Sequence, residues 1–116
     1  MKFCPPKVKL AERPLMDCAV AGDLESLFAV LANDTRLRLL HEIARTDEVC
    51  VTDLAGALEM KPQAVSNQLQ RLQDKGVVAS RRDGNKMHYR IVDPCVTTLL
   101  DRGLCLLEET DRRRRV

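Results

Sequence analysis

The 116-residue sequence predicts a mostly α-helical domain that carries one small β-hairpin, and three observations lead to this prediction. Apolar residues recur at helical spacing in several segments between Leu15 and Lys75. After Gly76 the apolar period changes to two, on both sides of a DGN turn, and helical spacing returns from Pro94. Helices, a tight helix-helix break, a hairpin and a terminal helix, in this order, are typical of a winged helix-turn-helix.

Two helices are expected before the break. The first covers residues 15–32, and the second, residues 33–46, is expected to begin with a cap at Asn33 or Asp34. His41, in the middle of the second helix, is expected to be a core histidine. The apolar positions expected to face the core are Leu24, Leu27, Phe28 and Leu31 in the first helix, and Leu37, Leu40 and Ile43 in the second.

The helix-turn-helix itself is expected in residues 52–75. Thr52 is expected to cap a short helix, and Lys61-Pro62 separates it from the next one, because proline suits a first helical turn. That next helix is expected to end at Gly76, since glycine readily takes the left-handed conformation that ends a helix.

The helix of residues 62–75 has the chemistry of a DNA-reading helix. Its apolar positions should face the core, so that short polar side chains face solvent, where they could reach base edges in a major groove. Basic residues around this helix and in the hairpin would hold phosphates. The predicted base-reading residues are Gln63, Ser66, Asn67 and Gln70, and the predicted phosphate contacts are Lys61, Arg71, Arg81, Arg82 and Lys86.

Composition and charge distribution set the expected organisation. Hydrophobic residues make up 45% of the chain and charged residues 31%, as in a folded domain, and the net charge is only +2. No apolar run approaches the roughly 20 residues that span a bilayer, and no signal peptide is recognisable, so a cytoplasmic location is expected. We predict a mobile arm in residues 1–14, a DNA-binding and dimerisation domain in residues 15–110 and a basic tail in residues 111–116.

Five cysteines, an odd number without a secretory signal, make a disulfide scaffold unexpected. Thiolates are the ligands that soft metal and metalloid ions prefer. Metal binding, redox sensing and plain burial all remain open from composition alone. A thiol enzyme is not expected, because Cys50 and His41 fall on separate predicted helices and no motif marks a substrate pocket.

Four segments resemble the ArsR/SmtB family of metal-responsive repressors: LFAVLANDTRLRLLHEIA, EVCVTDLAGAL, AVSNQLQRLQDKGVV and RRDGNKMHYRI. The resemblance covers roughly residues 22–109, with its elements in the family's order. It implies a homodimer joined through the N- and C-terminal helices, an inverted-repeat operator in double-stranded DNA, and an inducer that weakens DNA binding. One departure is Asn67, where the family often has histidine, although an asparagine can also donate and accept at a base edge.

The resemblance also implies candidate ligands for the inducing ion. Cys50 occupies the place of the first cysteine in the family's ELCVC box, but Thr52 replaces the second. In the family's cadmium and lead branch an N-terminal arm supplies further thiolates, and Cys4 and Cys18 are placed to do so, from the partner subunit. This set predicts release from DNA by As(III), Cd(II), Pb(II) or Hg(II), and no organic cofactor.

Two alternatives accompany this prediction. The family's zinc site on the C-terminal helix is incomplete here, but Cys95 with the partner's Cys105 would make a variant thiolate site. The same scaffold could also sense oxidants or persulfide through a pair of cysteines, in which case inactivation would need no metal.

Overall fold

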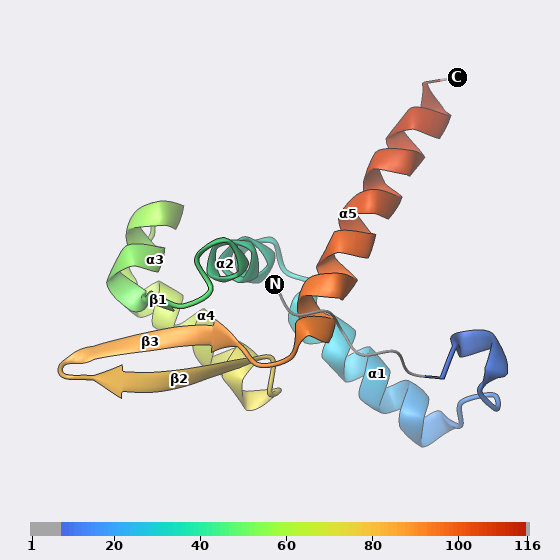
Figure 1. Cartoon of the computed structure of the whole chain (residues 1–116), viewed down its shortest axis with the longest axis horizontal. Helices are drawn as coiled ribbons and strands as arrows, with labels where there is room; N and C mark the ends of the chain where they lie inside the picture. Colours follow the sequence, from blue (N-terminus) through green and yellow to red (C-terminus); the bar gives the residue numbers. More distant parts are fainter. Residues whose placement is uncertain (1–7, 116) are drawn as a thin grey trace.

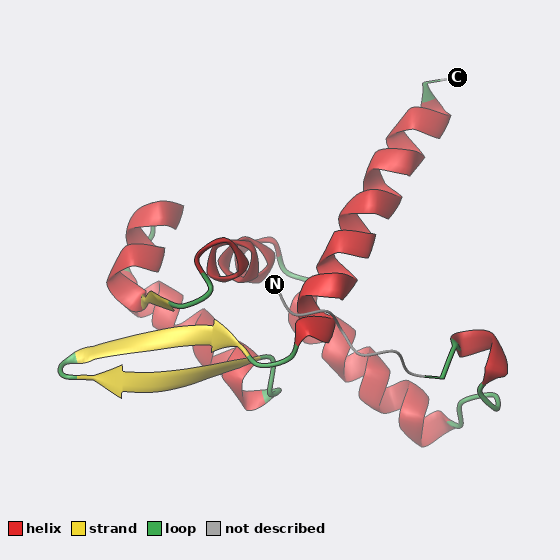
Figure 2. Cartoon of the chain, in the orientation of Figure 1, coloured by secondary structure: helices red, strands yellow, loops and turns green. Residues whose placement is uncertain are grey.

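The computed structural model describes residues 8–115 (Figure 1). The small antiparallel sheet lies along one edge of the helical body, its hairpin projects outward, and the last helix extends away from the body (Figures 1 and 2). This architecture confirms the predicted winged helix-turn-helix. Its elements are the 3-10 turn η1 (Leu10–Glu12), α1 (Cys18–Leu31), α2 (Asp34–Thr46), β1 (Val49–Cys50), α3 (Val51–Leu58), α4 (Pro62–Asp74), β2 (Val78–Asp83), β3 (Lys86–Ile91) and α5 (Pro94–Arg114).

The helix starts follow side-chain caps in two of the first three helices. Asp17 accepts a hydrogen bond from the backbone N–H of Val20, so α1 begins at Cys18 rather than at Leu15. Asn33 caps α2, as predicted. The predicted cap at Thr52 is wrong: pairing in β1 keeps the chain extended up to Cys50, α3 starts directly after it, and Thr52 already lies inside the helix.

The sheet has the strand order β1-β3-β2, with antiparallel pairs throughout. The hairpin of β2 and β3 is the predicted wing, and Gly84 in its turn has a φ of +65°, a conformation that L side chains rarely adopt. The two-residue strand β1 was not predicted. It pairs with β3 in a register that sets Cys50 opposite His88.

The hydrophobic core lies among α2, α3, α4 and the sheet. Leu40 and Ile43 are fully buried, as predicted. Leu37 is 39% exposed and His41 is also exposed, so the predicted core positions of these two residues are wrong. The reason is that Leu37, His41 and Ala44 follow one another at helical spacing on a second face of α2, which lines a groove with α5 instead of packing into the core. The largest fully buried side chains are Leu39, Leu40, Ile43, Leu54, Val65, Leu69, Leu72, Val77 and Val78.

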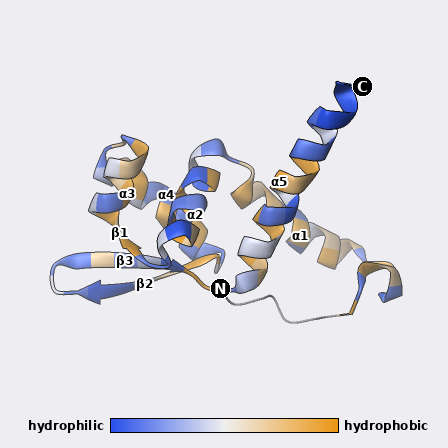
Figure 3. Cartoon of the chain, turned by 45° about the horizontal axis from the view of Figure 1, so that its top comes forward, coloured by the Kyte–Doolittle hydropathy of each residue, from blue (hydrophilic) through white to orange (hydrophobic). Residues whose placement is uncertain are grey.

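The two terminal helices contribute little to this core. α1 buries only Leu31, so the predicted core positions of Leu24 and Phe28 are wrong, and none of the side chains of α5 is buried. Figure 3 shows apolar segments along both helices and a hydrophilic C-terminal end on α5. α5 continues to Arg114, so most of the predicted basic tail is helical. Among residues 8–115, no helix is long and apolar enough to cross a membrane.

Candidate nucleic-acid interface and thiol pocket

The second helix of the helix-turn-helix, α4, has one buried and one exposed face. Val65, Leu69 and Leu72 are fully buried, which fixes the exposed face on the opposite side. Pro62 occupies the first helical turn. After Asp74 the chain leaves the helix through Gly76, whose φ is +72°, and the N–H of the next residue returns to the carbonyl of Leu72 at 2.9 Å. Both predicted ends of this helix are thus confirmed.

The exposed face of α4 carries side chains that can donate and accept hydrogen bonds. Gln63 and Asn67 are exposed in its N-terminal half, where the Gln63 Nε2 donates to Asn67 Oδ1 at 3.0 Å. The amide group of Asn67 and the carbonyl oxygen of Gln63 remain on the surface, and such groups read the edges of base pairs. Ser66 is half-buried beside them. Gln70, further along, donates instead to the carboxylate of Asp74 at 2.8 Å.

The preceding helix, α3, packs against α4 and is linked to it by a tight turn. Glu59 has a φ of +55°, in the left-handed region, and the N–H of Met60 donates to the carbonyl of Ala55 at 2.9 Å. Lys61 and Arg71, the predicted phosphate contacts at the two ends of α4, are both exposed. This arrangement packs α3 on α4 and leaves Lys61 and Arg71 on the exposed surface.

The wing carries four arginine and lysine side chains, Arg81, Arg82, Lys86 and Arg90; all four are exposed, and Arg81 is also paired. Arg82 and Lys86 are exposed near its turn. Arg81 lies against Glu48: its Nη2 is 2.5 Å from the Glu48 Oε1, and its Nε donates to the same oxygen at 2.8 Å. The structure thus gives Arg81 a partner inside the protein, and this contact fastens the wing to the segment that precedes β1.

The hydrogen bond from Arg81 and the charges of Arg81 and His88 hold the pKa of Glu48 below its ordinary value of 4.5. A lowered carboxyl pKa stabilises the fold above the unfolded-state value, and the contribution is lost as the pH falls through the folded-state pKa. We therefore expect Glu48→Gln to reduce stability relative to wild type at pH 7, and the difference to shrink as the pH drops below 4.5 toward the lower folded-state pKa of Glu48. Urea unfolding followed by circular dichroism between pH 7 and pH 3 measures it.

The control for this prediction is Glu59→Gln, which removes an exposed carboxylate at the end of α3. Its effect on the free energy of unfolding should be small and should not vary in this pH range in the way expected for Glu48. A loss in Glu48→Gln that stays constant from pH 7 to pH 3 would show that the charge of Glu48 contributes nothing.

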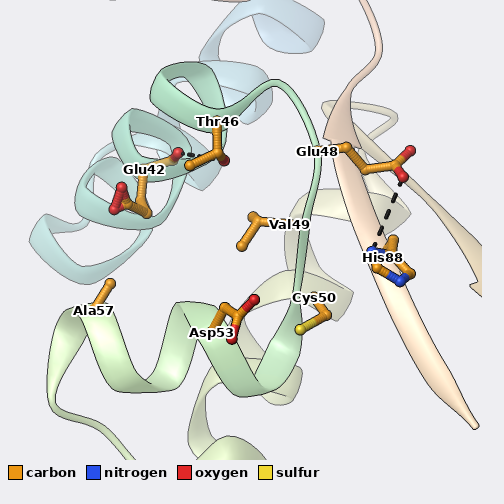
Figure 4. A pocket seen from close by; sticks show the side chains of 8 residues that line it. All are labelled: Glu42, Thr46, Glu48, Val49, Cys50, Asp53, Ala57 and His88. Carbon is orange, nitrogen blue, oxygen red and sulfur yellow. Dashed lines mark hydrogen bonds and ion pairs between the residues drawn. The ribbon is translucent and has the colours of Figure 1, made fainter.

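A small pocket of about 260 Å³ lies between the start of α3, the end of α2 and β3 (Figure 4). Cys50 and Asp53 lie on one side of it, across from Glu48 and His88. The Cys50 side chain is 5% exposed, and the His88 Nδ1 lies 4.0 Å from the Glu48 carboxylate. The pocket therefore places the Cys50 thiol near carboxylates and an imidazole, which are groups that bind cations. It lies directly beside the first turn of α3.

The other predicted thiol ligands lie elsewhere. Cys18 is exposed at the start of α1, an end of the molecule well away from β1 and α3 in Figure 1. Cys105 is exposed on α5, and Cys95 is half-buried in the first turn of that helix. Cys4 lies outside the described residues. Residues 8–115 of one chain bring no three His, Cys, Asp or Glu side chains together as a metal site.

An apolar groove of about 640 Å³ runs between α1, α2 and α5. Phe28 from α1, Leu37 from α2 and Leu104 and Leu107 from α5 line it, and each is more than a third exposed. His41 lies in the same groove. The groove brings exposed apolar side chains of both terminal helices together on one face.

Glu48 and Arg36 are not recognisable from the sequence as residues that position the site. Both act through contacts to residues more than thirty positions away in the chain, Arg81 and Gln68 respectively. No local pattern marks such partners, because neither lies on the same helix or strand as its partner.

Comparison with known proteins agrees with this geometry. Residues 33–86 match the profile of the MarR family. The chain is 34% identical to the transcriptional repressor SmtB homolog of Synechocystis sp. over 105 residues, which cover 90% of this chain and 79% of the relative. Further relatives are named as cadmium-resistance and arsenic-resistance regulators.

Solved structures show the same fold. The crystal structure of the AntR antimony-specific transcriptional repressor is 59% identical, has a TM-score of 0.79, and matches over 94% of this chain and 98% of that one. The solution structure of a homodimeric winged helix-turn-helix DNA-binding domain from Mycobacterium bovis is 28% identical, with a TM-score of 0.76 over 90% of this chain and 95% of that one.

Proposed function

Because this chain belongs to the ArsR/SmtB family of DNA-binding transcriptional regulators, which are not enzymes, we propose that it is a homodimeric, cytoplasmic repressor released from its operator by a thiophilic ion. One observation carries the proposal: Cys50, a buried thiol in a pocket with cation-binding groups, is the residue from which α3 starts. α3 packs on α4, whose exposed face holds Gln63 and Asn67.

The homodimer is proposed from the groove between α1, α2 and α5. Its apolar side chains are exposed in the single chain, and a second copy would bury them around a two-fold axis. Two α4 helices in such a dimer would read the two halves of an inverted repeat. The relative from Mycobacterium bovis is a homodimer with the same fold, which supports this assembly.

Thiolate binding is proposed for the inducer because soft ions prefer sulfur ligands. The similarity to a repressor described as antimony-specific makes Sb(III) the first ion to test, followed by As(III), Cd(II), Pb(II) and Hg(II). An ion that binds Cys50 stabilises the position of α3 in which the other ligands can also reach the ion. If this position of α3 differs from the one that fits the operator, binding of the ion weakens binding of DNA. Since one chain does not assemble three donors within residues 8–115, further ligands would come from Cys4 or from the partner subunit.

The test measures operator binding by fluorescence anisotropy with fully reduced protein, adding each ion in turn. We expect one ion to release wild type, and Cys50→Ser to stay bound at ion concentrations at least about 100-fold higher, since losing one thiolate of three removes a large share of the affinity. The regulated genes would then be those for efflux or detoxification of that ion. Cys105→Ser, at an exposed thiol on α5, is the matched control, and Cys18→Ser tests whether Cys18 of the partner subunit is one of the ligands.

The outcomes separate the candidate sites. Cys50→Ser that responds like wild type, together with Cys105→Ser that does not, would place the ion on α5 instead. If no ion acts but peroxide or persulfide releases the DNA, the repressor senses redox chemistry through a pair of cysteines. A protein that binds no duplex with sequence preference under any of these conditions would contradict the repressor function.

A further inference from the structure

The guanidinium group of Arg36 joins three helices. Arg36 belongs to the first turn of α2, and its side chain is half-buried. Its Nε donates to the backbone carbonyl of Val30 in the last turn of α1 at 2.6 Å. Its Nη1 donates to the Gln68 Oε1 of α4 at 2.8 Å. One side chain therefore ties the end of α1 to the recognition helix.

The contact at α1 has a clear physical basis. The last carbonyls of a helix lack partners within it and carry partial negative charge, so a cationic donor at that position is stabilising. Val30 lies one residue before the end of α1. Because the guanidinium is planar and rigid, its hold on Val30 also fixes the direction in which its other nitrogens point.

The contact at α4 restrains a motion that apolar packing permits, the rotation of α4 about its own axis. Val65, Leu69 and Leu72 bury α4 against the core, but apolar contacts have no direction and tolerate small rotations of a helix about its axis. The hydrogen bond at Gln68 does have direction. Since Gln68 is the neighbour of Asn67, a rotation of α4 that broke it would also turn Asn67 away from its present position.

We infer that Arg36 and Gln68 are a positioning pair that sets the placement of α4 relative to α1, and hence the operator half-site spacing that the dimer prefers. The inference rests on the proposed function, in which α1 contributes to the dimer interface. In such a dimer the distance between the two recognition helices depends on how α4 is held to α1. Half-sites must lie about one turn of DNA, roughly 34 Å, or a multiple of it, apart.

The test first selects a duplex from a random library with wild-type protein, and then varies the distance between its half-sites by one and two base pairs. Arg36→Met keeps the length and helix propensity of the side chain but removes its donors. We expect it to weaken binding to the selected duplex about tenfold, as the loss of a charge-assisted hydrogen bond implies, with little change for the altered spacings. Its preference for the selected spacing should therefore fall.

Matched variants separate positioning from general destabilisation. Gln68→Met should behave like Arg36→Met, and the double variant should be no worse than either, because both remove the same bond. Gln68→Glu, which keeps an acceptor for Arg36, should retain the spacing preference. Binding to a duplex with a single half-site should change less than about threefold in all of them, because a lone half-site imposes no spacing and a released α4 can still turn Gln63 and Asn67 toward it.

Two results would overturn the inference. Arg36→Met with an unchanged preference among spacings, or single losses that add fully in the double variant, would show that Arg36 does not act through Gln68. If wild type selects a duplex and these results follow, the inference fails while the repressor function stands. If wild type selects no duplex at all, the proposed function fails, and this inference fails with it.

Discussion

Asn67→Ala is expected to weaken operator binding by about 30-fold to 10⁴-fold, because a lost base-edge contact costs about 1–3 kcal/mol and a symmetric dimer loses it twice. Asn67 is exposed in the N-terminal half of α4, the part of a recognition helix that approaches base edges. The Asn67 Oδ1 already accepts a hydrogen bond from Gln63, so the Asn67 Nδ2 is the atom left to donate to a base. The two side chains act as one polar unit. Fluorescence anisotropy with the wild-type operator measures the loss.

Gln70→Ala is the matched comparison, since it makes the same kind of change one turn further along α4. Its side chain donates to Asp74, whose carboxylate would repel phosphates, so we expect a much smaller loss of affinity. The salt dependence adds a second readout: Asn67→Ala should leave the slope of log affinity against log salt unchanged, whereas Lys61→Ala should reduce it. Equal losses in Asn67→Ala and Gln70→Ala would contradict the assignment of Asn67.

Most of the fold could be predicted from the sequence because the residues that determine it act on the backbone next to them. Caps at Asn33, the proline at the start of α4, Gly76 at its end and Gly84 in the wing each dictate the backbone within a few residues. The wing was predictable from its alternating apolar pattern. Strand β1 was not, because two residues that pair with a distant strand leave no period to detect.

The candidate site was predictable to the extent that it follows from the face of one helix. Once Val65 and Leu69 are assigned to the core, the exposed position of Asn67 follows from helix geometry alone. The pairing of Arg81 with Glu48 does not, because it joins the wing to a loop thirty-three residues earlier. A basic residue in a wing is therefore predicted to face phosphate by default, and only the folded chain reveals an internal partner.

The second face of α2 illustrates the same limit. His41 is exposed, although a helical pattern with apolar residues on either side favours a core position. The pattern cannot distinguish a face that packs on the core of its own chain from a face that lines an open groove. Leu37 and His41 belong to the latter, since they line the groove that we propose as the dimer interface.

Leu104→Asp is the second substitution with a large expected effect, because it places a charge in the groove that is proposed to hold the second copy. Leu104 is 52% exposed in the single chain and none of the side chains of α5 is buried, so the fold of the chain should survive. A two-fold interface contains the change twice. We expect sedimentation equilibrium to show a monomer, with operator affinity reduced by about 10²–10⁴-fold, as the second half-site no longer binds as part of one assembly.

Leu106→Asp is the matched control for Leu104→Asp. It makes the same chemical change on the same helix, at a leucine that is 64% exposed but does not line the groove, and it should leave the dimer and its DNA affinity close to wild type. A dimeric Leu104→Asp with wild-type affinity would show that the groove is not the interface. If both variants were monomeric, the interface would extend over more of α5 than the groove. If Leu104→Asp is monomeric yet folded, and a duplex with one half-site binds it as well as it binds wild type, each α4 reads DNA alone and α5 supplies the avidity of the pair.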